Sequence, residues 1–145
     1  MNRFLFSTGA ALLLGISAVA NAQENIGELQ AKGGKQLSGP ELRELLIGAT
    51  TNGRTTTGYS NEITIKPDGT ASGKFFGIGR TANIGLSGTW NIADDGKMCV
   101  KYDFDGPIPS YQGCGYYYTA DGQYFISLSE SRKDSDKLLQ RTVKR

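Results

Sequence analysis

The residues of this sequence that could do chemistry are its carboxylates and its two cysteines. None of the 145 residues is histidine, which excludes a Ser-His-Asp triad, a Cys-His pair and a metal site with imidazole ligands. A pair of carboxylates acting as acid and base is the catalytic option that remains. The candidates are Glu62, Asp94, Asp95 and Asp103, and nothing in their spacing brings them together. We therefore predict a protein that is not an enzyme and needs no cofactor or metal, with a carboxylate-dependent enzyme as an alternative.

The first 22 residues have the pattern of a secretory signal peptide. Arg3 supplies the positive start, an apolar run follows, and Ala20-Asn21-Ala22 is the small-x-small pattern of a cleavage site. The apolar run is too short and interrupted for a membrane span. We expect cleavage after Ala22 and a soluble protein in the periplasm or outside the cell.

Export to an oxidising compartment bears on whether the two cysteines form a disulfide. Cys99 and Cys114 are the only two in the chain, and in an oxidising compartment the simplest expectation is one disulfide. A free buried pair and half of a metal site are the alternatives. The metal alternative is weak because zinc usually takes four ligands and no histidine can complete the set.

After the signal peptide, residues 23–36 are polar and are expected to form a flexible leader, with at most one weak helical turn around Ile26 to Leu29. Residues 37–145 are expected to form a single β-rich domain. Ser38 and Glu41 have the spacing of a capping box, and Pro40 suits a first helical turn. An apolar stripe of leucines follows and Gly48 ends it. One short amphipathic helix is therefore predicted over about 39–47.

The rest of the chain is typical of strands and tight turns. Asp-Gly occurs at 68–69, 95–96 and 121–122, and this dipeptide favours hairpins when alternating apolar residues flank it. Such alternation predicts about seven or eight antiparallel strands. A sheet of that size with one polar face usually curls and closes. The expected fold is a small antiparallel β-barrel or strongly curled sheet, with the helix covering one end.

Trp90 lies in the clearest strand and shares parity with Ile84, Leu86 and Ile92, so we expect it to be a buried core anchor. Gly88-Thr89-Trp90 resembles the Gly-x-Trp signature of lipocalin-like and avidin-like barrels. Those families carry the motif on their first strand, whereas here it follows several predicted strands.

A second resemblance spans roughly residues 36 to 125. The segment 37–42 (Leu-Ser-Gly-Pro-Glu-Leu), the turn 67–70 (Pro-Asp-Gly-Thr), Gly88-Thr89-Trp90 and the two cysteines resemble the pattern of a domain-of-unknown-function family. Its members are small exported proteins of Gram-negative bacteria. The resemblance implies export and a compact β fold, and it implies no activity or catalytic residues.

A hairpin turn near Gly106-Pro107 would place Cys99 opposite Cys114, within disulfide reach. Strand alternation then turns Val100, Tyr102 and Phe104 toward the core. Tyr116 and Tyr118 share the opposite face with the cysteines. Because tyrosine is enriched at interface hot spots, we predict a candidate interaction surface of Tyr116, Tyr118, Pro107, Ile108 and Tyr111. The alternative is that the helix or leader covers the two outer tyrosines as a second small core.

The net charge of the chain excludes one further class of function. A net charge of +2 argues against a nucleic-acid binder, which needs a concentrated basic patch. We expect an exported binding or interaction protein whose partner is a protein or a small apolar ligand. The first alternative is an inhibitor of an exported hydrolase, of protease or lysozyme type, with 105–111 as its probe loop. The carboxylate-dependent enzyme is the second.

Overall fold

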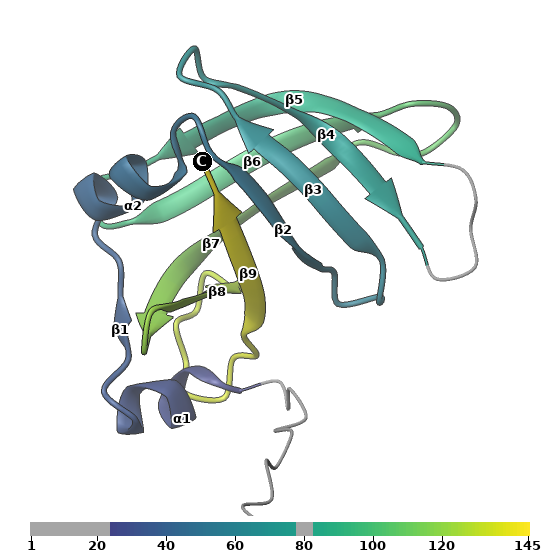
Figure 1. Cartoon of the computed structure of the whole chain (residues 1–145). Coiled ribbons are helices and arrows are strands. Elements are labelled where there is room, and N and C mark those ends of the chain that lie inside the picture. The colour runs from purple at the N-terminus through teal and green to yellow at the C-terminus, as the bar shows by residue number, and fades with distance from the viewer. Residues whose placement is uncertain (1–23, 78–82) are drawn as a thin grey trace, which may run out of the picture.

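The computed structural model describes residues 24–77 and 83–145, so the predicted signal peptide lies outside the described residues. Eight antiparallel strands close into a barrel and a short ninth strand, β1, adds to its outside (Figure 1). The strands are β1 (Lys35–Gln36), β2 (Thr50–Arg54), β3 (Ser60–Ile65), β4 (Thr70–Phe76), β5 (Ile84–Ile92), β6 (Lys97–Phe104), β7 (Tyr111–Ala120), β8 (Gln123–Ser127) and β9 (Leu139–Lys144). The predicted mainly-β barrel is confirmed.

The barrel is a meander for most of its length. Strands β2 to β8 each pair with the next along the chain, and β9 closes the ring between β8 and β2. All three Asp-Gly pairs form the predicted hairpin turns, joining β3 to β4, β5 to β6 and β7 to β8. Gly69, Gly96 and Gly122 have φ values of 85°, 84° and 74°, a backbone conformation that glycine adopts without a steric penalty.

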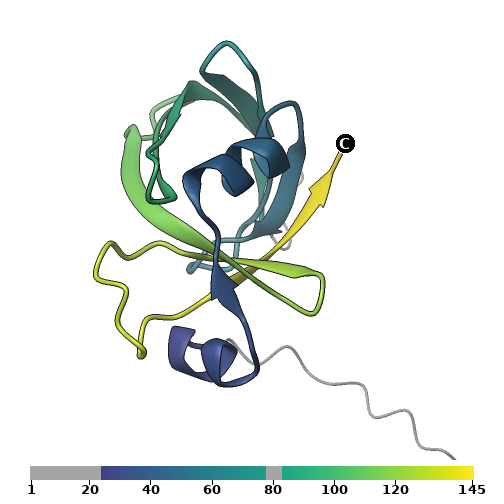
Figure 2. The same cartoon turned by 90° about the vertical axis from the view of Figure 1, so that its left-hand side faces the viewer.

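Helix α2 (Gly39–Leu46) lies across one end of the barrel (Figure 2). It begins with the predicted capping box between Ser38 and Glu41, and its Leu42 and Leu46 are fully buried in the main core. The Arg43 guanidinium donates to the Ile92 carbonyl at 2.8 Å and pairs with Asp94 at 2.9 Å. The helix is thereby attached to the end of β5. In the described part of the chain, no helix has both the length and the apolar character needed to cross a membrane.

Residues 25–36 include a helix and a strand where a flexible leader was expected over 23–36, and the helical turn expected around Ile26 to Leu29 is part of that helix. Helix α1 (Ile26–Ala31) begins at an Asn25–Glu28 capping box, and β1 pairs with β7. The apolar side chains of Ile26 and Leu29, three residues apart, are buried against the outside of the barrel. Tyr116 and Tyr118 of β7 and Phe125 of β8 supply the apolar face that these two side chains cover.

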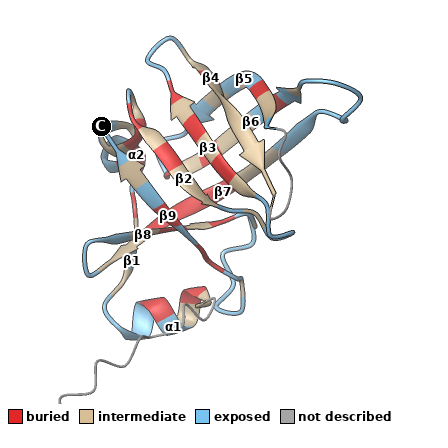
Figure 3. Cartoon of the chain, turned by 45° about the vertical axis from the view of Figure 1, so that its right-hand side comes forward, coloured by how far each residue is buried: buried red, intermediate tan, exposed pale blue. Residues whose placement is uncertain are grey.

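Burial alternates along the strands, as one buried face requires. In β3, Asn61, Ile63 and Ile65 are buried and the residues between them are not; Figure 3 shows the same interruption of buried segments along β2 and β3. Trp90 departs from the expectation of full burial. Its ring packs against the main core but is only partly buried, and its indole N–H donates to the Lys66 and Thr70 carbonyls, both at 3.0 Å. Trp90 therefore holds the β3–β4 turn as well as covering core residues.

Candidate functional site

The inside of the barrel contains a cavity of about 360 Å³, within the ~300–1,000 Å³ range of small-molecule sites. An eight-stranded barrel is wide enough to be filled by side chains or to hold one small ligand. Inward-facing residues of strands β3, β4, β6 and β8 supply most of its apolar lining, which includes Ile63, Ile65, Phe75, Met98, Val100, Phe104 and Ile126. The inward orientation predicted for Val100, Tyr102 and Phe104 is confirmed, since all three line this cavity.

The cavity reaches the surface at the end of the barrel away from α2. The turn residues Thr55–Thr57 between β2 and β3 line it, together with Tyr111 and Leu128, which are 40% and 43% exposed. In Figure 1 the β2–β3 turn and the β6–β7 loop lie at this end, opposite α2. The helix end is filled by leucine side chains, so the mouth is the route by which a small molecule can reach the interior.

Tyr111 leans across part of this mouth. Its ring stacks on Tyr102, with centroids 6.3 Å apart. Its hydroxyl lies over Gly113, where a Cβ atom would come within 2.3 Å of the hydroxyl oxygen. The absence of a side chain at Gly113 therefore leaves room for the tyrosine at the entrance.

One charged side chain, Arg141 of β9, points into the cavity. It is only 7% exposed. Its Nη1 donates to the backbone carbonyls of Arg54 at 3.0 Å and Gln140 at 2.9 Å. Among the described residues, the ion pairs join other side chains and none includes Arg141. A positive charge is thus held in an apolar interior by neutral groups alone.

Further polar groups line the same space. Burial raises the pKa of the Tyr117 hydroxyl, against the charge of Arg141 and a hydrogen bond with it, which act in the opposite direction. Burial likewise raises the pKa of Tyr102. Both hydroxyls therefore stay protonated at neutral pH. The Asn61 Oδ1 atom is buried and has no hydrogen-bond partner among the described residues, although buried polar atoms are usually paired.

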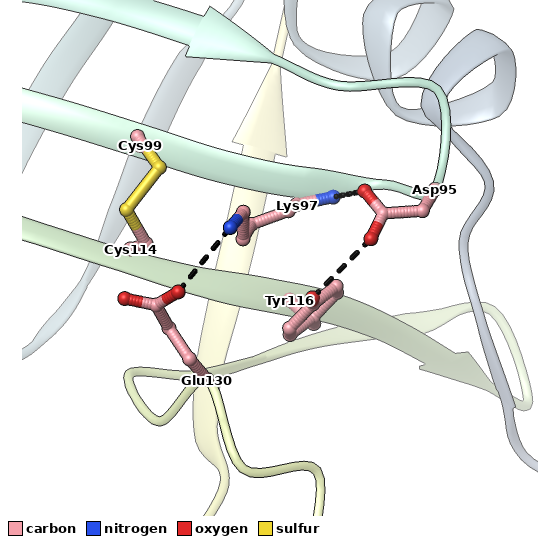
Figure 4. The surroundings of a disulfide bond; sticks show 6 residues. All are labelled: Asp95, Lys97, Cys99, Cys114, Tyr116 and Glu130. Carbon is pink, nitrogen blue, oxygen red and sulfur yellow. Dashed lines mark hydrogen bonds and ion pairs between the residues drawn. A yellow bond between two sulfur atoms is a disulfide. The ribbon is translucent and has the colours of Figure 1, made fainter.

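The predicted disulfide between Cys99 and Cys114 is present, with the two Cα atoms 4.0 Å apart and the residues directly opposite in the β6–β7 ladder (Figure 4). Around it on the outside of the barrel, the Tyr116 hydroxyl donates to Asp95 at 3.4 Å and Lys97 pairs with Glu130 at 3.3 Å. The first contact joins β7 to the β5–β6 turn, and the second joins β6 to the segment that follows β8.

Tyr116 and Tyr118 do not form a free contact patch, which corrects that part of the predicted interaction surface. They are 4% and 1% exposed. Both belong to a second core cluster with residues of α1, β8 and the segment before β9, namely Ile26, Leu29, Phe125 and Leu138. The alternative of a small outer core is the one observed, because α1 covers this face. The other residues of that surface are exposed, Pro107 and Ile108 on the β6–β7 loop and Tyr111 at the start of β7.

The candidate catalytic carboxylates have separate partners. Glu62 pairs with Lys74 at 3.5 Å, while Asp94 pairs with Arg43 on α2. Asp95 accepts from the Lys97 backbone N–H at 3.0 Å, and Asp103 accepts from the Ser110 hydroxyl. No group of three or more Cys, Asp or Glu residues suited to a metal ion occurs in the residues that the structure covers.

Arg141 and its surroundings are not among the functional residues predicted from the sequence. The available signal was its parity: in β9, Arg141 alternates with exposed neighbours and shares the inward face with Leu139 and Val143. An arginine at a position of a barrel strand where alternation predicts an inward-facing apolar residue indicates a charge inside the barrel. Asn61 gives a similar signal in β3, where it shares parity with Ile63 and Ile65.

No protein-family model, curated protein or solved structure matches this chain. The cavity and the side chains that line it are therefore the basis on which function can be inferred.

Proposed function

We propose that the protein is an exported binding protein that holds a small apolar molecule inside its barrel. The observation that carries this proposal is the cavity of about 360 Å³, lined mainly by aliphatic and aromatic side chains and open at one end. Protein interiors are normally close-packed, with few voids larger than a water molecule. A mostly apolar cavity with a few convergent polar groups is the usual form of a small-molecule site.

Two features support export, and two others favour a small ligand over a protein partner. The pattern of residues 1–22 is that of a signal peptide, and the Cys99–Cys114 disulfide suits an oxidising compartment. The two outer-face tyrosines, the strongest candidates for a protein contact, are buried under α1. The exposed Ile108 lies on the loop joined to Tyr111 at the mouth, which favours a role for this loop at the entrance over a role as an inhibitor's probe.

The test is a fluorescence titration of the mature protein with N-phenyl-1-naphthylamine, a neutral apolar dye that brightens when it leaves water. Val100→Phe would fill part of the cavity, whereas Lys101→Phe adds the same ring on the exposed face of the same strand. We expect saturable binding by the wild type and by K101F, and little or none by V100F.

Circular dichroism melting checks that each variant is folded. If V100F does not fold, Ile126→Phe fills the cavity from β8 instead. The proposal would be contradicted if the wild type did not increase the fluorescence of the dye. It would also be contradicted if a folded variant with a filled cavity bound the dye as well as the wild type does.

A further inference from the structure

We infer that the ligand is an apolar chain or ring that ends in a single carboxylate, and that Arg141 binds this carboxylate inside the barrel. The inference rests on the proposed function, because it specifies the chemical class of the molecule held in the same cavity. It is carried by the placement of one buried guanidinium among apolar side chains.

The buried positive charge of Arg141 has no negative partner among the described residues. Arginine remains protonated at any ordinary pH, and moving its charge out of water is unfavourable unless an opposite charge or a full set of acceptors compensates. No carboxylate among the described residues forms an ion pair with Arg141. An anionic ligand would supply the missing negative charge.

The Arg141 guanidinium also has N–H groups that no described residue accepts from. A guanidinium has five N–H groups. Nη1 uses two of them on the Arg54 and Gln140 carbonyls, and the Tyr117 hydroxyl can accept a third. At least two N–H groups then remain, which is the number that a bidentate carboxylate takes from arginine.

The neighbouring polar groups suit an anion as well. Tyr117 and Tyr102 line the cavity with Arg141. Because burial keeps both hydroxyls protonated, each can donate a hydrogen bond to a carboxylate oxygen.

The number of charges selects the class of anion. Arg141 is the only charged residue among the described residues that line the cavity. One positive charge matches a monoanion, whereas a phosphate monoester carries nearly two negative charges at neutral pH. The remaining lining is aliphatic and aromatic, so the rest of the molecule is expected to be apolar. A fatty acid of medium length has this combination.

The experiment compares two ligands of equal length, decanoate and 1-decanol, as competitors of the bound neutral dye. It uses the wild type, Arg141→Gln, and Arg145→Gln as the matched control at the exposed end of the chain. We expect the wild type and R145Q to bind decanoate about tenfold or more tightly than decanol, since a hydrogen bond to a charged group is worth at least that factor. R141Q should bind both ligands about equally and should still bind the dye.

Tyr117→Phe gives a second readout that does not remove the charge. It should weaken decanoate by a few-fold and decanol by less, because a hydrogen bond to a charged acceptor is stronger than one to a neutral hydroxyl. Melting curves confirm that each variant is folded, and Y117F carries the test if R141Q does not fold.

The outcomes separate the two proposals. If the dye and both competitors bind but decanoate has no advantage in the wild type, or keeps it in folded R141Q, the carboxylate inference is overturned and the apolar binding function stands. If neither the dye nor either competitor binds the wild type, the binding function itself fails, and the inference fails with it.

Discussion

Gly53 lies directly opposite Arg141 in the β2–β9 ladder, and the guanidinium occupies the space that a side chain at position 53 would need. A Cβ atom on Gly53 would come within 2.3 Å of Nη1 and 2.8 Å of the Gln140 carbonyl oxygen. Arg141 therefore packs over Gly53 of the neighbouring strand, and its Nη1 donates to the carbonyls of Arg54 in that strand and of Gln140 in its own strand. A glycine in one strand thus helps to position a charge carried by another.

Gly53→Ala is predicted to destabilise the protein and to disturb the position of Arg141. Overpacking of a close contact typically costs about 1–3 kcal/mol, and we expect a loss in this range in a urea titration. Decanoate affinity should fall more than affinity for the neutral dye. Thr142→Ala, an exposed change in β9, is the control and should alter stability by less than about 0.5 kcal/mol. Equal stability of G53A and wild type would contradict the close contact.

Arg141→Met is predicted to make the ligand-free protein more stable. Apolar replacement of a buried charged group is often neutral or stabilising, and here the charge has no counter-ion among the described residues. We expect the free energy of unfolding to rise by about 1 kcal/mol in urea, while Arg145→Met leaves it unchanged. A loss of more than about 1 kcal/mol would mean that the hydrogen bonds from Nη1 outweigh the cost of burying the charge.

The pattern of alternating apolar residues and Asp-Gly turns was sufficient to predict most of the barrel. The β6–β7 register and the facing cysteines also followed from it. Strand β2 was missed because its sequence, Thr-Thr-Asn-Gly-Arg, has no apolar alternation; pairing on both sides by β3 and β9 makes it a strand. The cavity could not be predicted, since it depends on how inward side chains from many strands fill the interior. The buried charge of Arg141 was predictable, because Arg141 shares the inward-facing parity of Leu139 and Val143 in β9.

Removal of the Cys99–Cys114 disulfide is predicted to lower stability without changing the fold. The cysteines are separated by 15 residues, and closing a loop of that length stabilises a protein by about 3 kcal/mol in the chain-entropy model. The double variant Cys99→Ala with Cys114→Ala should show this loss in urea and retain the β-type circular dichroism spectrum. A loss under about 1 kcal/mol would show that the β6–β7 hairpin is already constrained by its neighbours.

The capping box of α2 is predicted to make stability depend on pH in acid. A hydrogen bond from Lys35, followed by those from the Ser38 backbone and hydroxyl, lowers the pKa of Glu41 to about 2. Because this pKa lies below the ordinary value of 4.5, the stabilisation is fully present above pH 4.5 and is lost as pH falls toward 2. NMR titration of the Glu41 carboxyl should give a midpoint near 2, and a midpoint near 4.5 would contradict the capping geometry. Glu44→Gln, on the same helix, should leave the Glu41 titration unchanged.

The location of the ligand is tested most directly by methyl NMR of the mature protein with bound decanoate. Isoleucine methyl groups report on both cores: Ile63, Ile65 and Ile126 line the cavity, whereas Ile26 is buried in the outer cluster under α1. We predict nuclear Overhauser effects from the decanoate methylenes to the three cavity methyls and none to Ile26. Effects confined to Ile26, or to the exposed loop residue Ile108, would place the ligand outside the barrel and contradict the account.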